Sequence, residues 1–470
     1  MSETELSASV SEGPEHTRWS VVTALGLATL VVASELTMSA FTLAGASEAF
    51  GVSSAATAWI VSAYTLPLVA VGIPAGRWLD RADAGLVYLL ALVAVAVTSI
   101  WSAAAGSFVS LIASRIALGT AAAFFLGIYM PIVAATVREN QHGLAIGVIG
   151  TIMMLGGVGL APVGGWAAEE LGWRWVFLVK LPILVVALLM GWWTIPRKGA
   201  IAATGERRLP PLGMAFLNDI FWLGLAGFAL LKGLDLLVHS PIWGAACLAA
   251  TVVFSVIWTR FDSAKAPLSL LSRPGFGLPA LALTLIAAII GLAAFSFPFY
   301  ITDVLQESPQ LLAIAVVGFV IASAVAAPIS GLLADKIGPV MMSAIGAAIT
   351  VMGILTLLLL DANSERWDLI WCAVAAGFGM GSFNTAIMTT LLNAAGEKER
   401  GAASGLAGVA RMLGSTIGPA VAAMAWGLVG GGVAGLHAGA IALAGLAFIG
   451  LLALIWALRL QAGAATQPTA

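Results

Sequence analysis

Long apolar runs dominate the sequence, and short breaks that contain charged residues, proline or glycine separate them. A helix needs about 20 apolar residues to cross a lipid bilayer, and fourteen runs fit this requirement. Their centres lie near residues 32, 66, 95, 121, 156, 184, 226, 250, 290, 321, 350, 380, 414 and 447. A β-barrel would show short stretches of alternating polarity instead. The pattern therefore predicts an all-α polytopic membrane protein with fourteen transmembrane helices.

The composition supports the same class. Charged residues make up 9% of the 470 residues and hydrophobic residues 60%, whereas soluble domains carry about 25% charged residues. The sequence has no phosphate-binding G-x-x-x-x-G-K-[ST] motif that would suggest direct use of ATP. We therefore expect a protein that is not an enzyme and that has no cofactor, no metal ion and no nucleic-acid partner.

The placement of positive charge predicts the orientation in the membrane. If both termini are cytoplasmic, 15 of the 21 Lys and Arg residues fall in the tails or inner loops, and only Arg174 and Arg366 fall in outer loops. Cytoplasmic loops of membrane proteins are enriched in Lys and Arg. The acidic N-terminal tail also differs from a cleavable signal peptide. We expect a multi-pass protein of the inner (plasma) membrane with both termini in the cytoplasm.

Three short patterns recur at nearly the same spacing. "GRWLDRAD" at 76–83 returns as "GLLADKIG" at 331–338, "HGLAIG" at 142–147 returns as "RGAASG" at 400–405, and Pro162 corresponds to Pro419. The offsets of 255, 258 and 257 residues indicate two parallel six-helix halves, as in many secondary transporters. The expected organisation is a cytoplasmic tail at 1–18, an N-terminal six-helix bundle at 19–197, a linker with two inserted transmembrane helices at 198–276, a C-terminal six-helix bundle at 277–460 and a cytoplasmic tail at 461–470.

These motifs resemble those of a known family. Both loop repeats look like the G-x-x-x-D-x-x-G motif of the major facilitator superfamily, and "LIASRIALG" at 111–119 and "GGVGLAPVGG" at 156–165 resemble its fourth-helix and fifth-helix motifs. "WRWVFLVKLP" at 173–182, "SPQLLAIAVVGF" at 308–319 and the two-helix insert resemble the fourteen-helix drug:proton antiporter branch. The resemblance implies alternating access driven by protons, with a coupling role for the acidic residue of the first helix.

The repeated loops are candidate gates at the inner side. Asp80 and Asp335 follow the cytoplasmic ends of spans and can accept hydrogen bonds from a neighbouring helix N-terminus, where the macrodipole favours an anion. Arg77, Arg81 and Lys336 can meet the loop "GEKER" at 396–400 or its counterpart in the other half. The alternative is that these are ordinary solvated loop charges.

The fifth and eleventh helices of the two halves are candidate gating helices. Both are rich in glycine, which lets helix backbones approach closely, and each carries a proline that removes a backbone donor. Static close packing is the alternative explanation. The residues singled out for gating are Gly159, Pro162, Gly418 and Pro419.

Four charged residues fall deep within apolar runs: Glu35, Arg115, Lys180 and Arg411. A charge at the bilayer centre costs at least about 2.5 kcal/mol, so each one needs a partner or water. Counting about 1.5 Å of rise per helical residue puts the first three at a similar depth in the outer half of the membrane and Arg411 near the midplane. We expect Glu35, Arg115 and Lys180 to form one cluster.

Glu35 is the candidate coupling acid, and Arg115 is its candidate tuning partner. A nearby cation favours the carboxylate and desolvation favours the neutral acid, so a cluster that is alternately wet and dry can take up and release a proton. The alternative is a salt bridge that only orients helices. Lys180 and Arg411 are candidates for attracting an anionic group of the substrate. Asp219, near the inner end of the first inserted helix, is expected at the membrane interface.

Other polar and soft side chains are candidates for a central substrate path, because Met and aromatic residues can re-pack around varied apolar ligands. Asn384 is the strongest of them, since an amide is unusual at that depth. Core packing is the alternative explanation for such a stripe. The binding candidates besides Lys180 and Arg411 are Met38, Thr42, Tyr64, Tyr300 and Asn384, with Tyr129 and Met153 among the further path residues.

Together these features predict a proton-coupled secondary active exporter of small amphipathic or drug-like molecules. Its partners are expected to be a small-molecule substrate, protons and the lipid bilayer, and we expect a monomer. A dedicated exporter of an anionic metabolite, lipid or siderophore with the same fold is the main alternative. A non-transporting membrane sensor is a third interpretation, which leaves the duplicated inner loops unexplained.

Overall fold

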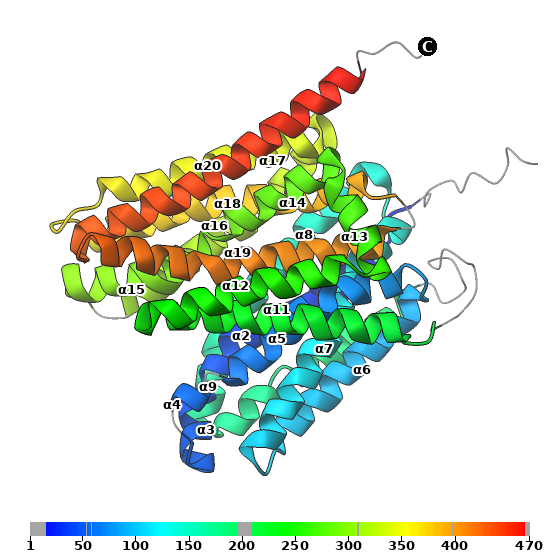
Figure 1. Cartoon of the computed structure of the whole chain (residues 1–470), viewed down its shortest axis with the longest axis horizontal. Helices are drawn as coiled ribbons and strands as arrows, with labels where there is room; N and C mark the ends of the chain where they lie inside the picture. Colours follow the sequence, from blue (N-terminus) through cyan, green and yellow to red (C-terminus); the bar gives the residue numbers. More distant parts are fainter. Residues whose placement is uncertain are drawn as a thin grey trace, which may run out of the picture.

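The computed structural model describes residues 16–52, 54–57, 59–195, 209–307, 310–396 and 399–465. These residues form helices joined by turns, and no strand occurs in these ranges. The long helices lie beside one another along roughly one direction (Figure 1). The all-α prediction is therefore confirmed for the described part of the chain.

The N-terminal group of helices comprises α2 (Trp19–Ala40), α3 (Leu43–Phe50), α4 (Ser54–Thr57), α5 (Trp59–Leu79), α6 (Ala84–Ala103), α7 (Phe108–Thr136), α8 (His142–Gly159), α9 (Ala161–Glu170) and α10 (Leu181–Thr194). Two short 3-10 helices, η2 (Glu139–Gln141) and η3 (Trp173–Phe177), connect them. Three helices follow, α11 (Met214–His239), α12 (Pro241–Thr259) and α13 (Asp262–Ser272).

The C-terminal group begins with α14 (Pro274–Ala287) and continues through the π-helix η4 (Leu292–Ser296), α15 (Phe297–Phe299) and the π-helix η5 (Tyr300–Val304). The remaining elements are α16 (Gln310–Ile337), α17 (Pro339–Leu355), the 3-10 helix η6 (Thr356–Leu359), α18 (Arg366–Ala394), α19 (Arg400–Leu428) and α20 (Gly432–Ala465).

Side-chain caps and prolines mark several helix starts. Asp83 accepts a hydrogen bond from the Leu86 N–H at 3.0 Å before α6, and Ser107 caps α7 in the same way. Such caps satisfy backbone donors that have no partner inside the helix. Proline in the first turn, where a missing N–H costs nothing, opens α10, α12, α14 and α17.

Twelve helices in the described residues are long and apolar enough to cross a membrane, or thirteen if α13 and α14, bent by 89°, form one span. The expected spans near residues 156 and 290 are helical but interrupted. The first breaks at Leu160 between α8 and α9, just before Pro162, and the second contains the two π-helices. The count of fourteen spans therefore stays a prediction.

The N-terminal and C-terminal groups pack against each other through two helix pairs, α5 with α19 and α8 with α16. A methyl group at Gly76 of α5 would collide with the backbone of Gly401 in α19, and one at Gly143 of α8 would collide with the backbone of Gly331 in α16. The two contacts thus require glycine, because only its lack of a side chain lets the backbones approach this closely.

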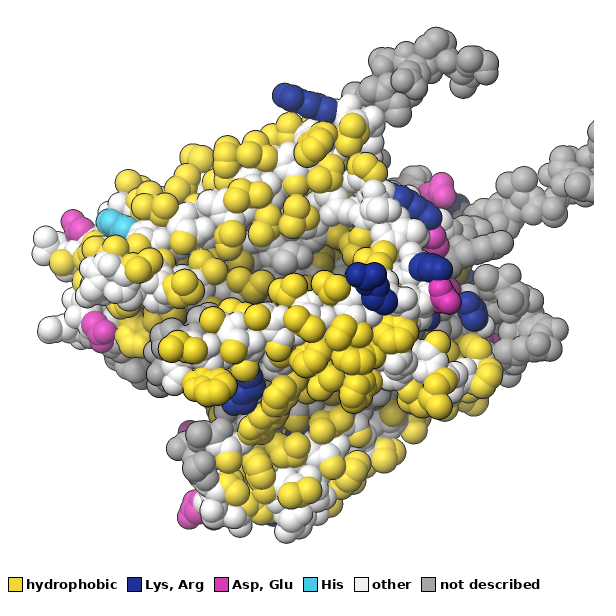
Figure 2. Space-filling view, in the orientation of Figure 1, with side chains coloured by type: hydrophobic (Ala, Val, Ile, Leu, Met, Phe, Trp, Pro, Cys, Tyr) yellow, Lys and Arg dark blue, Asp and Glu magenta, His cyan; other side chains and the backbone are white. Residues whose placement is uncertain are grey.

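Helices α11 and α12 pair with each other, and α11 also packs on α5 (Figure 1). The Trp59 and Phe228 rings stack with centroids 5.7 Å apart, and the Lys232 Nζ lies 5.4 Å from the Trp59 ring. Hydrophobic side chains cover most of the flank that these helices present in Figure 2, whereas Lys, Arg, Asp and Glu gather toward the ends of the molecule. This distribution is typical of a protein whose flank faces lipid.

Candidate functional site

A buried ion cluster joins three helices of the N-terminal group. Glu35 of α2 accepts a hydrogen bond from Arg115 of α7, with Oε2 2.7 Å from the Nη1 atom. Lys180 Nζ forms an ion pair with the other carboxylate oxygen, Oε1. All three side chains are at most 2% exposed. The structure therefore brings together the three residues that depth counting placed at one level.

Each of the three guanidinium nitrogens of Arg115 donates a hydrogen bond. Its Nε donates to the Ile60 carbonyl at 3.0 Å, and its Nη2 donates to the Ser39 hydroxyl at 2.6 Å. The Tyr64 ring lies 5.1 Å from the guanidinium carbon, and the Tyr64 hydroxyl donates to the Val32 carbonyl at 3.0 Å. Arg115 therefore ties α2, α5 and α7 together, and a fork-shaped donor is needed for this set of acceptors.

Lys180 lies at a helix start, whereas the sequence predicts a continuous helix at this position. It is the residue just before α10, whose second residue is Pro182, so the sixth run is divided into η3 and α10. Proline in the first turn favours a helix start at this point. The Lys180 ammonium contacts the Glu35 Oε1 atom, so each carboxylate oxygen of Glu35 has a cationic partner.

Arg411 of α19 lies where the N-terminal and C-terminal groups meet. Its guanidinium makes a weak contact, from Nη1 to the Met153 sulfur of α8 at 3.9 Å. Tyr129 of α7 is the titratable group that interacts with it electrostatically. No Asp or Glu in the described part of the chain forms an ion pair with Arg411, and its side chain is only partly buried.

The remaining binding candidates differ in their surroundings. Asn384 is 7% exposed, and its Oδ1 atom has no partner in the described residues. Met38 packs against α9 near Gly164, and the Thr42 hydroxyl donates to the Ser39 carbonyl at 2.7 Å within its own turn. The Tyr300 hydroxyl donates to the Asp361 carbonyl at 2.7 Å inside the C-terminal group. The hydroxyls of Thr42 and Tyr300 are thus already used.

Two carboxylates form matching latches between the N-terminal and C-terminal groups. Asp80 accepts from the N–H groups of Gly401 and Ala402 at 2.7 and 3.3 Å, at the start of α19. Asp335 accepts from Gly143 and Leu144 at 2.9 and 3.2 Å, at the start of α8. Each carboxylate therefore caps a helix of the other group, which confirms that both meet a helix N-terminus.

The Asp80 carboxylate is largely buried in this contact. Burial raises the pKa of Asp80 to about 7, against the effect of the hydrogen bonds from Gly401 and Ala402, which favour the carboxylate. Glu399 raises the pKa further, and the nearby Arg81 lowers it. Arg81 itself is exposed. The latch thus contains a group that changes its protonation near neutral pH.

Within the described ranges, the partners of Arg77 differ from the predicted loop at 396–400, where Glu399 pairs with Arg273 at 2.6 Å. Arg77 donates to Asp219 of α11 at 3.0 Å and to the Ser263 carbonyl. We call the four residues Arg77, Asp219, Trp258 and Ser263 the brace.

The brace also shows how Asp219 is held near the inner end of α11. Its carboxylate is 1% exposed, and its Oδ1 accepts from the Trp258 indole at 2.9 Å and from the Ser263 hydroxyl at 2.5 Å. An acidic residue in an apolar helix was the available signal, but its partners come from three separate segments. The brace joins α5, three residues before Asp80, to α11, α12 and α13.

The Gly-Pro gating candidates fall into two situations. Gly159 ends α8 with open space around it, and Pro162 is exposed in the first turn of α9. Gly418 packs tightly on the Ala288 backbone, which belongs to the same group of helices, and α19 continues through Pro419. The two Gly-Pro motifs therefore differ here, since one marks a break and the other lies in an unbroken helix.

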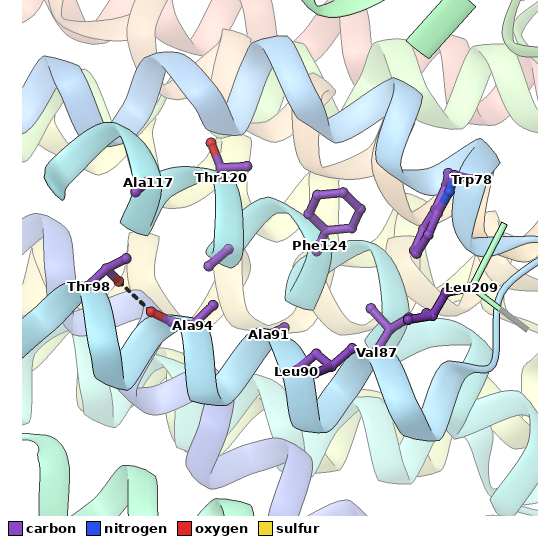
Figure 3. Close-up of a pocket in the computed structure, with 11 residues that line it drawn as sticks. Trp78, Val87, Leu90, Ala91, Ala94, Thr98, Ala117, Thr120, Phe124 and Leu209 are labelled. Carbon is purple, nitrogen blue, oxygen red and sulfur yellow. Dashed lines mark hydrogen bonds between the residues drawn. The ribbon is translucent and has the colours of Figure 1, made fainter. Parts of the chain in front are cut away.

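An apolar groove of about 430 Å³ lies between α6 and α7 (Figure 3). Trp78 and Leu209 line one end of it, and the Trp78 indole donates to the Pro210 carbonyl at 2.8 Å. Its polar lining residue Thr98 donates its hydroxyl to the Ala94 carbonyl at 2.6 Å. The groove contains no charged side chain, so it is separate from the ion cluster.

Comparison with known families identifies the family of the chain. The family model described as Major Facilitator Superfamily matches residues 24–299 and 280–470. The chain belongs to the major facilitator superfamily. The protein is accordingly a multi-pass membrane transporter, and the resemblance found in the sequence is confirmed at the level of the superfamily.

Individual relatives of this superfamily transporter are distant. It is 26% identical over 376 residues to the uncharacterized transporter YebQ of Escherichia coli K12, covering 79% of this chain and 80% of that one. It is 24% identical over 417 residues to the tetracenomycin C resistance and export protein of Streptomyces glaucescens, covering 86% and 75%. The human organic anion transporter MFSD10 shares its fold with a TM-score of 0.67, at 17% identity over 93% of this chain and 99% of that one.

Proposed function

We propose that this transporter is a proton-coupled exporter of small amphipathic or drug-like molecules. It works by alternating access as a fourteen-span member of the drug:proton antiporter branch, with both termini on the cytoplasmic side of the inner membrane. The observation that carries the proposal is Glu35, a carboxylate at most 2% exposed that pairs with two cations, Arg115 and Lys180. The two cations favour the charged form of such a group and burial favours the neutral acid, so a change in its surroundings can move its proton.

Charge counting shows what protonation does to the cluster. With Glu35 ionised, two cations face one anion, and protonation leaves both cations without a counter-charge. Removing one partner of a buried ion pair costs about 3–5 kcal/mol, because the other charge is left unpaired in a dry interior. Proton uptake by Glu35 therefore drives Lys180 and Arg115 toward water or another anion, and it loosens α2, α7 and α10 from one another.

The inner latches support the alternating-access part of the proposal. Asp80 and Asp335 hold the N-terminal and C-terminal groups together at two pseudo-equivalent places. Opening toward the cytoplasm requires both carboxylates to leave their helix N-termini, which is a switch between two discrete packings. Arg81 is already exposed, so it can face Asp80 in water once the latch has opened. Gly159 and Pro162 act as the break that lets the outer part of the fifth span move, and Gly418 and Pro419 act as its packed counterpart.

The relatives support the substrate class and the direction of transport. One similar protein is named for tetracenomycin C resistance and export. At this level of identity the name suggests export of an organic molecule and leaves the molecule itself open. The proposed contacts of such a substrate are three buried residues. Met38 and Tyr64 lie on helices of the ion cluster or next to it, and Asn384 lies on α18, which packs on α8.

The proposal is tested by transport in proteoliposomes with an imposed pH gradient. A panel of cationic, neutral and anionic dyes is loaded, and gradient-driven flux is compared for the wild type and Glu35→Gln. We expect the variant to lose gradient-driven flux while it keeps a normal elution volume. Glu48→Gln, which changes an exposed carboxylate of α3, is the matched control. Undiminished gradient-driven flux in Glu35→Gln rules out the assignment of Glu35.

A further inference from the structure

Among the described residues, the ion cluster and Arg411 carry more positive charge than the carboxylates paired with them balance. Glu35 is paired with both Arg115 and Lys180, so the cluster already has one surplus cation. Arg411 adds another, because no described carboxylate pairs with it. A cation in the membrane interior without a counter-charge is costly, so it requires water or a bound anion.

The two candidate anion-attracting residues of the interior are not equivalent. The Lys180 ammonium is 1% exposed and lies against Glu35, so an anion reaches it only by displacing a carboxylate. Arg411 has a weak sulfur contact from Met153 at 3.9 Å and keeps part of its side chain accessible. A thioether sulfur is a poor acceptor for a guanidinium, and a bidentate oxyanion is a much better one. Arg411 is therefore the cation that is available to a ligand.

The surroundings of Arg411 fit an organic anion. The residue sits on α19, its sulfur contact comes from α8, and Tyr129 of α7 is its electrostatic neighbour, so helices of both groups meet around it. A site between two groups that rock against each other is accessible in turn from either side. Met153 supplies a polarizable apolar surface and Tyr129 an aromatic one, and both suit the carbon skeleton of a ligand.

A polar group on a neighbouring helix adds to this chemistry. Asn384 of α18 is buried, and its Oδ1 lacks a donor among the described residues. The next residue, Thr385, faces Gly150 of α8, one turn from Met153. Asn384 therefore lies on a helix that borders the same part of α8. A buried acceptor without a partner costs about 1–3 kcal/mol, which a ligand N–H or O–H would recover.

We infer that Arg411 is the anion-binding residue of this transporter and that its substrates are organic anions with an aromatic or apolar body. The inference rests on the proposed transport function and names its substrate class. The carboxylate, sulfonate or phenolate of the substrate pairs with the guanidinium, and the body packs on Met153 and Tyr129. Proton binding and substrate binding then take place at different sites. Glu35 with its partners Lys180 and Arg115 binds the proton, and Arg411 binds the substrate.

The test uses two xanthene dyes of similar size and opposite charge, fluorescein and rhodamine 123. Binding to the purified full-length protein in lipid nanodiscs is measured by fluorescence anisotropy, without a pH gradient. We expect the wild type to bind fluorescein more tightly than rhodamine 123. Arg411→Gln should weaken fluorescein binding by about 10- to 100-fold, as expected for a lost charge-assisted hydrogen bond, and should leave rhodamine 123 binding unchanged or tighter. Arg411→Lys should restore part of the fluorescein affinity.

Arg366→Gln, which removes an exposed arginine at the start of α18, is the matched control and should bind both dyes as the wild type does. Elution volume and melting temperature establish that each variant is folded. The inference is overturned if the wild type fails to bind fluorescein or prefers rhodamine 123, or if folded Arg411→Gln binds fluorescein as tightly as the wild type. Selective fluorescein binding without gradient-driven flux contradicts the proposed function alone, whereas gradient-driven flux of rhodamine 123 in preference to fluorescein contradicts this inference alone.

Discussion

The inner latch at Asp80 predicts a gate that responds to cytoplasmic pH. In the closed arrangement burial raises the pKa of Asp80 from 3.8 to about 7. When the inner end opens, the side chain returns to water and its ordinary pKa is restored. The closed state therefore binds the proton more tightly, so acid favours closure. This contribution is fully present below about pH 4 and is lost as the pH rises through about 7.

The size of the effect follows from the two pKa values. Between about pH 4 and pH 7 each pH unit changes the closed-to-open ratio by up to about tenfold, or about 1.4 kcal/mol. Asp80→Asn removes the titrating group and keeps an oxygen that accepts from the backbone N–H groups of Gly401 and Ala402. We expect the variant to lose this pH dependence and to keep the latch.

Pulsed electron paramagnetic resonance between the inner ends of the two groups measures the gate. Asn140 and Asn393 are exposed near these ends, so Asn140→Cys and Asn393→Cys carry the spin labels after Cys247 and Cys372 are replaced by serine. Glu35→Gln is included in every sample, so that the proposed coupling acid does not titrate.

The readout is the fraction of molecules in which the two spin labels lie far apart, which represents the state open at the inner end, as a function of pH. We call this fraction the long-distance population. We expect this population to grow from acid to neutral pH when Asp80 is present and to grow clearly less in Asp80→Asn, in which the matching latch carboxylate Asp335 remains. The matched control is Asp262→Asn, whose carboxylate is 91% exposed, and it should respond as the parent does. An equal pH response with and without Asp80, or no response in either protein, refutes the reasoning.

Two further predictions concern packing at the inner end. Gly76→Ala places a methyl group against the Gly401 backbone, so it should deplete the short-distance population in the same assay, whereas Gly106→Ala, which faces open space, should not. Asp219→Ala leaves Arg77 without its carboxylate and should lower the apparent melting temperature, because breaking a buried ion pair costs about 3–5 kcal/mol, somewhat less here since Arg77 is 23% exposed. An unchanged melting temperature for Asp219→Ala would contradict the brace.

The ion cluster was predictable because its chemistry leaves few choices. A carboxylate and two cations in apolar runs each need a partner, and the constant rise of a helix converts residue number into depth. This argument found Glu35, Arg115 and Lys180. It did not find the helix start after Lys180, since the effect of Pro182 on a membrane span depends on what packs against it.

The brace was harder to predict for a different reason. Asp219 and Arg77 are 142 residues apart, and the placement of α11 and α12 against the N-terminal group is decided by shape complementarity over whole helices. Charge patterns within each segment carry no information about that placement. The same holds for Tyr300, whose polar hydroxyl suggested a substrate contact but bonds to the backbone at Asp361.

The brace also constrains how α11 and α12 can change in evolution. If α11 and α12 were only a spacer, a chain without them would function with no other change. Here their removal leaves Arg77 with a stranded charge three residues from Asp80, and it exposes the face of α5 that now packs on α11. A chain that lost α11 and α12 would therefore need a compensating substitution at position 77, so these two helices and the loop motif are expected to evolve together.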